Sequence, residues 1–447
     1  MRRAVVVSLA ALVLLAAGAV AAYVVYKTRV QVHSVQGSST VEFVTTDAPK
    51  APRIKGAIEW PNFGNGWDET RVGPSVKLQP PFHVDWVAGG NSLLEFPPAL
   101  AYKRLYVANA HGDLMAYGTA SGRRAWTLHE KRCTASSPAV GRYAGGTVYE
   151  AFLQREPCKS RKADGEIVAV AAGSGAVRWR RAIGPSETSP LLVGNRLYVG
   201  DWRGKVYELE ARTGKVLWTF STRGAIKGAI AYAAGRVYAG SYDGHLYALS
   251  ARTGRLVWRA SSDARLFGRG RFYSSPAVAY GRVYVGATDH TVYSFGATTG
   301  KRRWSYVTGG YVYGSPAVWN GRVFVGSYDG RLYALDAATG KLEWRFRANG
   351  PISGSANVID GVVYFATLKG RTYGLDTRSG KLLWSFADGM YAPLTTDGKR
   401  AFLLGYGKIY GLLPKVTAPA KRQHAAARGG TARHARSAKR RSRRSAG

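Results

Sequence analysis

Acidic side chains are the residues from which catalysis would have to be built in this chain, because carboxylates hold hard cations and transfer protons. Between residues 85 and 414 the acids fall largely in tight hairpin turns or directly before a Thr/Ser-Gly turn. A short acceptor side chain at such a position caps the turn. The acids therefore indicate turns, and no catalytic carboxylate pair is predicted. The members of this set are Asp243, Asp289, Asp329, Asp336 and Asp376.

Other catalytic signatures are missing from the sequence. It contains no P-loop, no Gly-x-Ser-x-Gly nucleophile motif and no Cys-x-x-Cys-His haem-attachment motif. Its 2 cysteines cannot form a four-cysteine zinc site or a dense disulfide framework. We therefore predict no catalytic residues, no metal site and no bound cofactor.

Aromatic and basic side chains indicate binding chemistry instead. Trp202, Tyr242 and Tyr328 stand at the tips of Gly-Asp-Trp-Arg-Gly and Gly-Ser-Tyr-Asp-Gly turns, where packing demands least. Bases with interleaved aromatics are typical of a docking surface for a peptide or an anionic partner. The competing interpretation is an ordinary solvated, arginine-rich surface. The predicted partner-binding residues are Trp202, Lys227, Tyr242, Arg265, Arg269, Arg271, Tyr328 and Arg345.

A repeat of about forty residues supplies the elements that would position these side chains. A small residue, a glycine, three variable residues and a tryptophan recur along the chain. Because a tryptophan holds the same place in every repeat, we predict that these side chains pack between repeats. The tryptophans are Trp86, Trp126, Trp179, Trp218, Trp258, Trp304, Trp344 and Trp384, at spacings of 40, 53, 39, 40, 46, 40 and 40 residues.

Each repeat predicts one blade of a β-propeller. Around Trp258, the β-rich runs 236–240, 245–249, 255–259 and 275–280 are separated by Asp-Gly and Thr-Gly turns and by a longer connection. Glycine accepts the positive φ of tight turns, and four short strands per forty residues are typical of a blade. Strand alternation puts the hairpins between second and third strands on the same face as the connections between blades.

The blade count follows from the two ends of the repeat array. The last set of three strands ends at Leu413 without a tryptophan strand, and the tryptophan strand at Trp86 has no set before it. We expect the two to complete one another. Residues 85–414 are therefore predicted to form one all-β, eight-bladed propeller of four-stranded antiparallel blades, closed by its N-terminal strand, which removes exposed sheet edges.

The run GRLYALDAATGKLEW at residues 330–344 resembles the quinoprotein repeat, also called the pyrroloquinoline quinone (PQQ) repeat, and the likeness extends over most of residues 85–414. The run EWPNFG at residues 59–64 also resembles the lead-in that precedes the first tryptophan strand in this family. The family includes eight-bladed quinoprotein dehydrogenases and non-enzymatic propellers, among them that of the outer-membrane β-barrel assembly machinery. The resemblance thus implies the fold and leaves two functions open.

The dehydrogenase alternative implies sequence features that this chain lacks. Members of that kind hold a quinone on the blade axis with a hard cation and a carboxylate base, and they usually carry a disulfide between neighbouring cysteines. Most repeats here have 39 or 40 residues, which leaves little chain for a cofactor pocket, and the cysteines are distant in sequence. We expect a non-catalytic binding or scaffolding module. A PQQ-dependent dehydrogenase and a small-ligand sensor in the axial funnel are the alternatives.

The two cysteines bear on the compartment. Cys133 lies in the connection entering the 53-residue repeat and Cys158 in that repeat's second hairpin, so both are expected at the same end of the propeller. We predict a disulfide between them, which fits an oxidising exterior. Two buried free thiols are the alternative.

The amino-terminal segment predicts export. An uncharged run from Ala4 to Tyr26 follows two arginines and is long enough to cross a membrane. The preceding bases predict that the N-terminus stays inside and the propeller lies outside. Val20-Ala21-Ala22 also suits a signal peptidase, in which case the propeller would be secreted.

The charge separates into distinct parts. The chain has 64 Lys and Arg against 27 Asp and Glu, a net charge of +37, yet 46% hydrophobic and 12% aromatic residues exclude a wholly disordered chain. Residues 415–447 hold eleven bases and no acid, which predicts a disordered basic tail that binds polyanions or is merely solvated. We thus expect a monomer with an anchor or signal at 1–30, a linker and lead-in at 31–84, the propeller at 85–414 and the tail at 415–447.

Overall fold

A computed structural model describes part of the amino-terminal segment and nearly all of the repeat region. Residues 12–20 are helical, and among the described residues no helix is long and apolar enough to span a membrane. The remainder of the predicted segment 4–26 and the predicted tail beyond Lys415 lie outside the described residues. The described ranges are 12–20, 33–36, 39–53, 56–156, 164–265 and 268–415.

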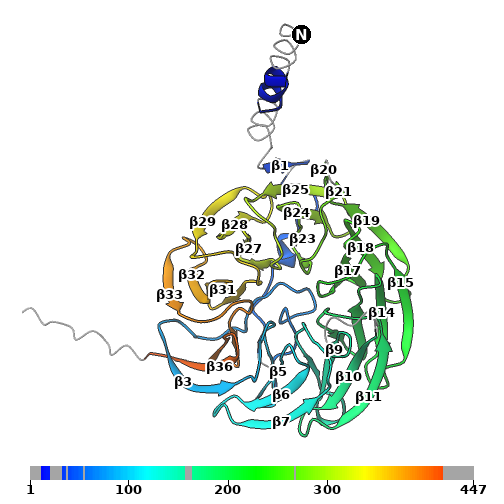
Figure 1. The fold of residues 1–447 in the computed structure, drawn as a ribbon, viewed down its shortest axis with the longest axis vertical. Coiled ribbons are helices and arrows are strands. Elements are labelled where there is room, and N and C mark those ends of the chain that lie inside the picture. The colour runs from blue at the N-terminus through cyan, green and yellow to red at the C-terminus, as the bar shows by residue number, and fades with distance from the viewer. Residues whose placement is uncertain are drawn as a thin grey trace, which may run out of the picture. The chain divides into compact units, whose positions relative to one another are not determined.

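The described strands form eight antiparallel blades arranged in a ring, as predicted (Figure 1). The closing blade contains β3 (Phe82–Gly89), β36 (Lys408–Pro414), β35 (Ala401–Leu404) and β34 (Thr395–Thr396). The next contains β4 (Ala99–Ala101), β5 (Arg104–Ala108), β6 (Asp113–Gly118) and β7 (Arg124–His129). It is followed by β8 (Ala139–Gly141), β9 (Thr147–Phe152), β10 (Gly165–Ala171) and β11 (Val177–Ile183).

The ring continues with blades of the same strand order. They are β12 (Leu191–Val193), β13 (Arg196–Gly200), β14 (Lys205–Glu210) and β15 (Val216–Ser221); then β16 (Ala231–Ala233), β17 (Arg236–Gly240), β18 (His245–Ser250) and β19 (Leu256–Ser261). Next come β22 (Ala277–Ala279), β23 (Arg282–Gly286), β24 (Thr291–Gly296) and β25 (Arg302–Val307); then β26 (Ala317–Trp319), β27 (Arg322–Gly326), β28 (Arg331–Asp336) and β29 (Leu342–Arg347). The last is β30 (Asn357–Ile359), β31 (Val362–Thr367), β32 (Arg371–Asp376) and β33 (Leu382–Phe386).

Shorter elements stand outside the four-strand pattern. They are β1 (His33–Val35), β2 (Ile58–Trp60), the hairpin β20 (Ala264–Arg265) and β21 (Gly268–Arg269), and two 3₁₀ turns, η1 (Thr45–Asp47) and η2 (Tyr143–Gly145).

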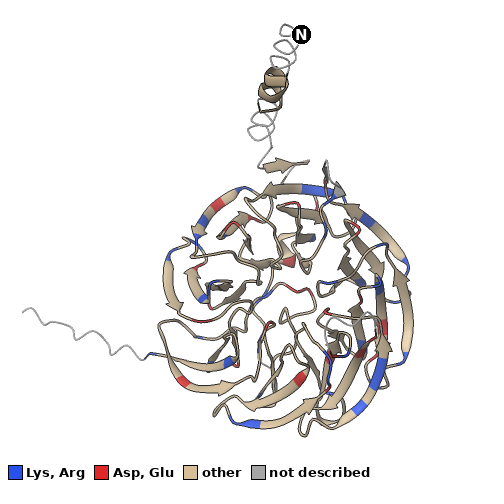
Figure 2. Ribbon diagram, viewed as in Figure 1, with Lys and Arg blue, Asp and Glu red and all other residues tan. Residues whose placement is uncertain are grey.

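Burial explains the strand composition. The second and third strands of each blade are almost wholly buried, as in β17 and β18, because neighbouring blades cover both of their faces. The fourth strand lies at the rim and mixes exposed and buried residues, as in β15 and β29. Figure 2 shows Lys and Arg spread along these rim strands. Part of the positive charge therefore lies on the outer wall of the ring.

The repeated tryptophans join consecutive blades. Each of seven indole N–H groups donates to a backbone carbonyl of the next blade, as from Trp218 Nε1 to Ala251 O at 3.1 Å and from Trp304 Nε1 to Ala337 O at 3.0 Å. The register between the third and fourth strands shifts immediately before each tryptophan. This bulge turns the indole toward the next blade. The same bond is formed by Trp86, Trp126, Trp179, Trp258 and Trp344.

The ring closes as the two ends of the array predict. β3 pairs antiparallel with β36, and Trp86 lies opposite Gly411. At this junction Trp384, in the preceding blade, contacts the closing strand through a T-shaped stack on Phe82 with a centroid distance of 5.3 Å. The closing blade has no Thr/Ser-Gly turn of the repeated kind, so the Trp384 indole packs on the aromatic ring of Phe82 instead.

The segment predicted as linker and lead-in contributes to the folded unit. β1 pairs with β25, and β2 pairs with β4. Between residues 61 and 71, backbone carbonyls accept hydrogen bonds from first strands of successive blades, for example Thr70 O from Val318 N at 3.0 Å and Arg71 O from Val358 N at 2.9 Å. The lead-in therefore lies across one end of the propeller axis.

A buried ion pair completes this axial segment. Arg71 Nη2 lies 3.1 Å from Glu69 Oε2, and the two side chains are 0% and 1% exposed. Asn62 Nδ2 donates to the other carboxylate oxygen at 3.0 Å, and the Arg71 guanidinium lies 4.3 Å from the Phe63 ring centroid. Phe63 in turn faces the opposite end of the axis.

Candidate functional site

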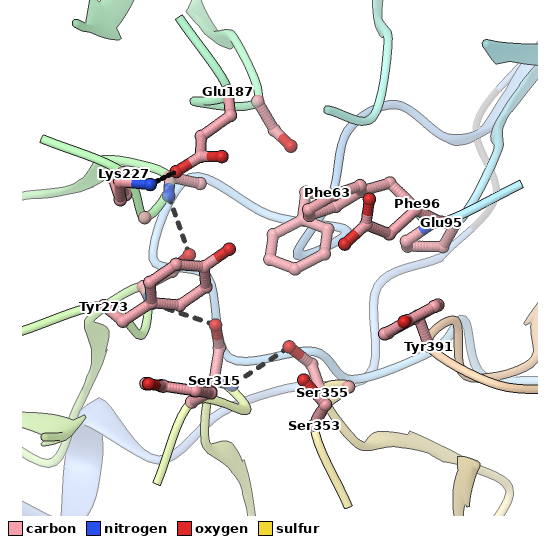
Figure 3. A pocket seen from close by; sticks show the side chains of 17 residues that line it. Phe63, Glu95, Phe96, Glu187, Lys227, Tyr273, Ser315, Ser353, Ser355 and Tyr391 are labelled. Carbon is pink, nitrogen blue, oxygen red and sulfur yellow. Dashed lines mark hydrogen bonds and ion pairs between the residues drawn. The ribbon is translucent and has the colours of Figure 1, made fainter. Parts of the chain in front are cut away.

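The two ends of the propeller differ in what they carry. Antiparallel alternation places the hairpins between second and third strands, such as residues 201–204, with the connections between blades, such as 222–230. We call this end the pocket face, because an axial pocket opens there (Figure 3). The lead-in lies at the other end, so Phe63 is its contribution to the pocket lining.

The pocket lining follows the repeat. One position in each connection lies four residues before the first strand of the blade, and seven of the eight residues at this position line the pocket. We call this set the axial ring: Glu95, Ala135, Glu187, Lys227, Tyr273, Tyr313, Ser353 and Tyr391, of which Ala135 is the exception.

A belt of serine hydroxyls fixes the axial ring. Two residues further along, in four of the connections, a serine Oγ accepts a hydrogen bond from the backbone N–H at the equivalent position of the preceding blade. Ser275 N donates to Ser315 Oγ at 2.9 Å, and Ser315 N to Ser355 Oγ at 3.0 Å (Figure 3). Ser189 and Ser275 accept in the same way from Ser137 N and Ala229 N. Because the backbone is held here, the side chains of the axial ring project from defined positions.

Glu187 and Lys227 form the ion pair of the pocket. Lys227 Nζ lies 2.7 Å from Glu187 Oε1, and both side chains are largely buried. Burial raises the pKa of Glu187, and the Lys227 ammonium opposes this shift. The pair therefore anchors one side of the pocket wall.

Glu95 is the second carboxylate of the pocket. Burial raises its pKa to about 7, with a further upward contribution from Glu187 and a smaller opposing one from Lys227. Phe96, next to it, lies against Phe63 with a ring-centroid distance of 6.0 Å. Glu95 is thus a carboxylate in an aromatic environment whose charge changes near neutral pH.

Aromatic rings surround the ammonium of Lys227. Its Nζ lies 4.5 Å from the ring centroid of Trp202, 5.3 Å from Tyr242 and 5.7 Å from Tyr273. The Arg271 guanidinium lies 5.4 Å from the Tyr242 ring. Four of the predicted partner-binding residues, Trp202, Lys227, Tyr242 and Arg271, are therefore placed together at the mouth of the pocket.

A second aromatic group continues this cluster around the mouth. Tyr313 lies 4.9 Å from Tyr273 and 4.9 Å from Tyr328, measured between ring centroids. Tyr328 also donates from its hydroxyl to Ser353 Oγ at 3.1 Å. Tyr311, 45% exposed, stacks on Tyr313 at 5.6 Å. We call the aromatic residues of both groups the aromatic belt: Trp202, Tyr242, Tyr273, Tyr311, Tyr313 and Tyr328.

The remaining predicted residues lie elsewhere. Arg345 is on the rim strand β29, away from the axial connections, at one of the exposed positions that alternate along this strand. Arg269 belongs to β21 and donates to Ser262 O at 3.1 Å, within its own connection. Arg265 belongs to β20, and its side chain is outside the described part of the structure.

The predicted cysteine pair is half described. Cys133 is disulfide-bonded. Cys158 lies outside the described residues, so the pairing stays a prediction.

Sequence reasoning missed five polar residues of the site: Glu95, Glu187, Tyr273, Tyr313 and Tyr391. A signal for them exists, because they recur at one register of the repeat, just before motifs such as Ser-Ser-Pro-Ala and Gly-Ser-Pro-Ala. Comparison of this column across the eight repeats would have shown conspicuous side chains at a position that faces the axis.

Fold and site together define a class: eight-bladed propellers joined by tryptophan docking, with a ring of connections around an axial pocket. A sequence profile of the family described as outer membrane protein assembly factor BamB matches residues 76–183, 163–309 and 308–441. These matches cover most of the chain, and the chain belongs to this family.

Individual relatives agree with this assignment. A 153-residue segment is 28% identical to the outer membrane protein assembly factor BamB of Shewanella oneidensis, covering 31% of this chain and 35% of that protein. The crystal structure of BamB from Moraxella catarrhalis superposes with a TM-score of 0.60 at 19% identity, over 74% of this chain and 100% of that one. The quinohemoprotein alcohol dehydrogenase of Comamonas testosteroni gives 0.65 at 15% identity, over 85% of each chain. At these identities the superpositions show a shared fold alone.

The residues of the axial pocket do not fit a calcium-bound PQQ. The quinone carries several carboxylates, yet the charged groups lining the pocket are two glutamates and one lysine that is already paired. A hard cation needs about six oxygen ligands. The described residues contain no cluster of three or more His, Cys, Asp or Glu side chains that could begin such a shell.

Proposed function

We propose that this chain is a non-catalytic, extracytoplasmic binding module whose pocket face docks on a protein partner. Membership of a family described as an assembly factor supports protein binding in general. The observation that carries the proposal is the gathering of Trp202, Tyr242, Lys227 and Arg271 at one end of the ring. Aromatic and cationic side chains of this kind supply most of the binding energy in protein interfaces.

The proposal includes where the module works. Residues 4–26 would anchor the chain in the cell membrane with the propeller outside, or would be removed as a signal peptide and release it. The basic tail at 415–447 would hold polyanions independently of the propeller, because charge attraction to a polymer needs no folded surface. The propeller itself would act as a monomer.

Crosslinking in the native membrane followed by mass spectrometry tests the docking face. Proteins recovered with the unmodified chain are compared with those recovered with a Trp202→Ala/Tyr242→Ala double variant. We expect the partner to bind roughly thirtyfold more weakly and to be recovered in correspondingly lower amount, because truncating interface aromatics costs about 2 kcal/mol or more. The matched control is Tyr143→Ala at the opposite end of the ring, in η2. Equal recovery with all three chains would refute the proposed face.

A PQQ-dependent dehydrogenase is the second candidate, favoured by the fold that this chain shares with the Comamonas enzyme. The purified chain mixed with quinone and Ca²⁺ provides the test. We expect no bound-cofactor absorption and no alcohol- or sugar-dependent dye reduction. Either signal would favour the enzyme.

A further inference from the structure

The axial pocket carries negative charge within a basic ring. Residues 85–414 contain 44 bases and 22 acids, yet the pocket is lined by two glutamates and one lysine. Because the Lys227 ammonium is paired with Glu187 at 2.7 Å, the charge left for a ligand is that of Glu95. This excess is local and opposite in sign to the rest of the propeller.

Glu95 stands apart from the paired groups. Within the described part of the chain its carboxylate forms no hydrogen bond and no salt bridge, although the side chain is half-buried. A buried carboxylate is costly unless a partner compensates it. A bound cation would supply that compensation.

Aromatic side chains complete the environment of this carboxylate. Phe63, Phe96, Tyr273, Tyr313 and Tyr391 line the same pocket (Figure 3). Ring faces attract organic cations, and they do so more strongly when water is excluded. A carboxylate combined with aromatic walls is the chemistry that recognises an alkylammonium or a guanidinium. A hard metal ion would require more oxygen ligands than the lining offers.

We propose that the axial pocket binds one organic cation, the ammonium of a lysine or the guanidinium of an arginine, that a protein partner inserts from the pocket face. The source of the cation rests on the proposed function, since the aromatic belt surrounds the mouth of the pocket. The chemistry of the pocket does not depend on it.

Binding should strengthen with rising pH. The titratable groups facing Glu95 are Glu187, Lys227, Tyr273 and Tyr391. The lysine probe keeps its charge below pH 9, so the proton that matters is the one on Glu95, whose pKa is about 7. Because the cation binds the ionised carboxylate, linkage predicts an affinity about tenfold higher at pH 8 than at pH 6.

Calorimetric titration of the full chain tests the inference with defined probes. N-acetyl-lysine methylamide and N-acetyl-arginine methylamide should bind at least tenfold more tightly than the uncharged N-acetyl-norleucine methylamide. Glu95→Gln should weaken binding by about tenfold at pH 8 and remove the pH dependence. Glu343→Gln, which alters an exposed rim carboxylate paired with Arg322, is the matched control and should change neither.

Three results would overturn the inference: equal binding of the lysine and norleucine probes, no effect of Glu95→Gln, or binding that weakens with pH. Butylammonium separates the sources, because tenfold tighter binding of this free amine than of the lysine probe would refute a side chain as the ligand. The two proposals fail separately. Loss of partner recovery in Trp202→Ala/Tyr242→Ala without probe binding would remove only the pocket inference, whereas probe binding with unchanged recovery would remove the docking face.

Discussion

At the scale of single residues, seven of the eight blade junctions depend on a glycine that faces a tryptophan. Gly254 has a φ of +68°, and a Cβ added to it would lie 2.6 Å from Trp218 Cδ2. Seven junctions repeat this approach, with Trp86 and Gly122 as the first pair. The recurrence of Gly and Trp in the sequence is therefore one contact repeated around the ring.

Gly254→Ala should destabilise the propeller through both the clash and the positive φ. Gly235→Ala is the matched control, because Gly235 has a φ of +74° but no atom within 4 Å of an added Cβ. The control should cost about 1 kcal/mol from backbone strain alone, and Gly254→Ala about 2 kcal/mol more from overpacking. Urea unfolding measures both free energies. Equal costs would show that the tryptophan contact does not constrain the junction.

A buried carboxylate should make stability depend on pH. Glu150 is fully buried, accepts from Thr134 Oγ1 at 3.3 Å and from Ser136 Oγ, and burial raises its pKa to about 8. A carboxyl whose pKa is raised on folding stabilises the folded state while it is protonated, and that contribution is lost as pH rises from about 4.5 to about 8.

We therefore expect the free energy of unfolding to fall between pH 5 and pH 8, and to fall less in Glu150→Gln. The amide keeps the shape without the charge. Unfolding midpoints in denaturant at both pH values provide the measurement. A variant with the same pH slope as the unmodified chain would contradict this role for Glu150.

The cysteines give a prediction at the same scale. If Cys133 pairs with Cys158, alkylation and intact mass of unreduced protein will find no free thiol. Replacement of Cys158 by serine should lower stability by about 3 kcal/mol, from a closed loop of about 26 residues. Two alkylated thiols in the unreduced chain would refute the pairing.

At the scale of elements, the lead-in acts as part of the fold because its backbone forms hydrogen bonds with the first strands of several blades.

Arg71→Met would leave Glu69 buried without its partner, and such a change costs about 3–5 kcal/mol. The double variant Glu69→Gln/Arg71→Met should recover part of this loss, since no buried charge then remains. Thermal unfolding of both variants measures the effect. A double variant no more stable than Arg71→Met would show that the ion pair is not what matters there.

The sequence predicts the elements unequally. Blade strands are predictable because their structural features fix residue types that can be read in the sequence. These features are the turn glycines, the alternating burial and one tryptophan per repeat. The position of the lead-in cannot be predicted in the same way. Its backbone carbonyls accept hydrogen bonds from backbone amides of the blades, and such bonds require no particular side chain. Pairing of β1 with β25 is hidden for the same reason.

The site follows the same division. Trp202 and Tyr242 could be predicted from their exposed turns, and Lys227 and Arg271 from the connections. Glu95 and Glu187 have no local pattern that indicates an axial direction, so only comparison of one register across the eight repeats could have pointed to them. Arg345 lies apart from these residues, because it belongs to the rim strand β29 and the connection begins only after that strand ends.

At the scale of the whole molecule, the ring separates its surfaces by charge. Lys and Arg occur along the rim strands (Figure 2). The lead-in lies across one end of the axis, and the other end opens into an acidic, aromatic-walled pocket (Figure 3). A partner that docks on the pocket face would meet the aromatic belt first and the carboxylates at the centre.

Site-specific photocrosslinking in the native membrane tests this account most directly. A photoreactive phenylalanine analogue replaces Trp202 or Tyr311 on the pocket face, or Tyr143 at the opposite end, all of which are exposed by at least 36%. The account predicts one discrete protein adduct from both pocket-face positions and none from Tyr143. Adducts from Tyr143 alone would contradict it.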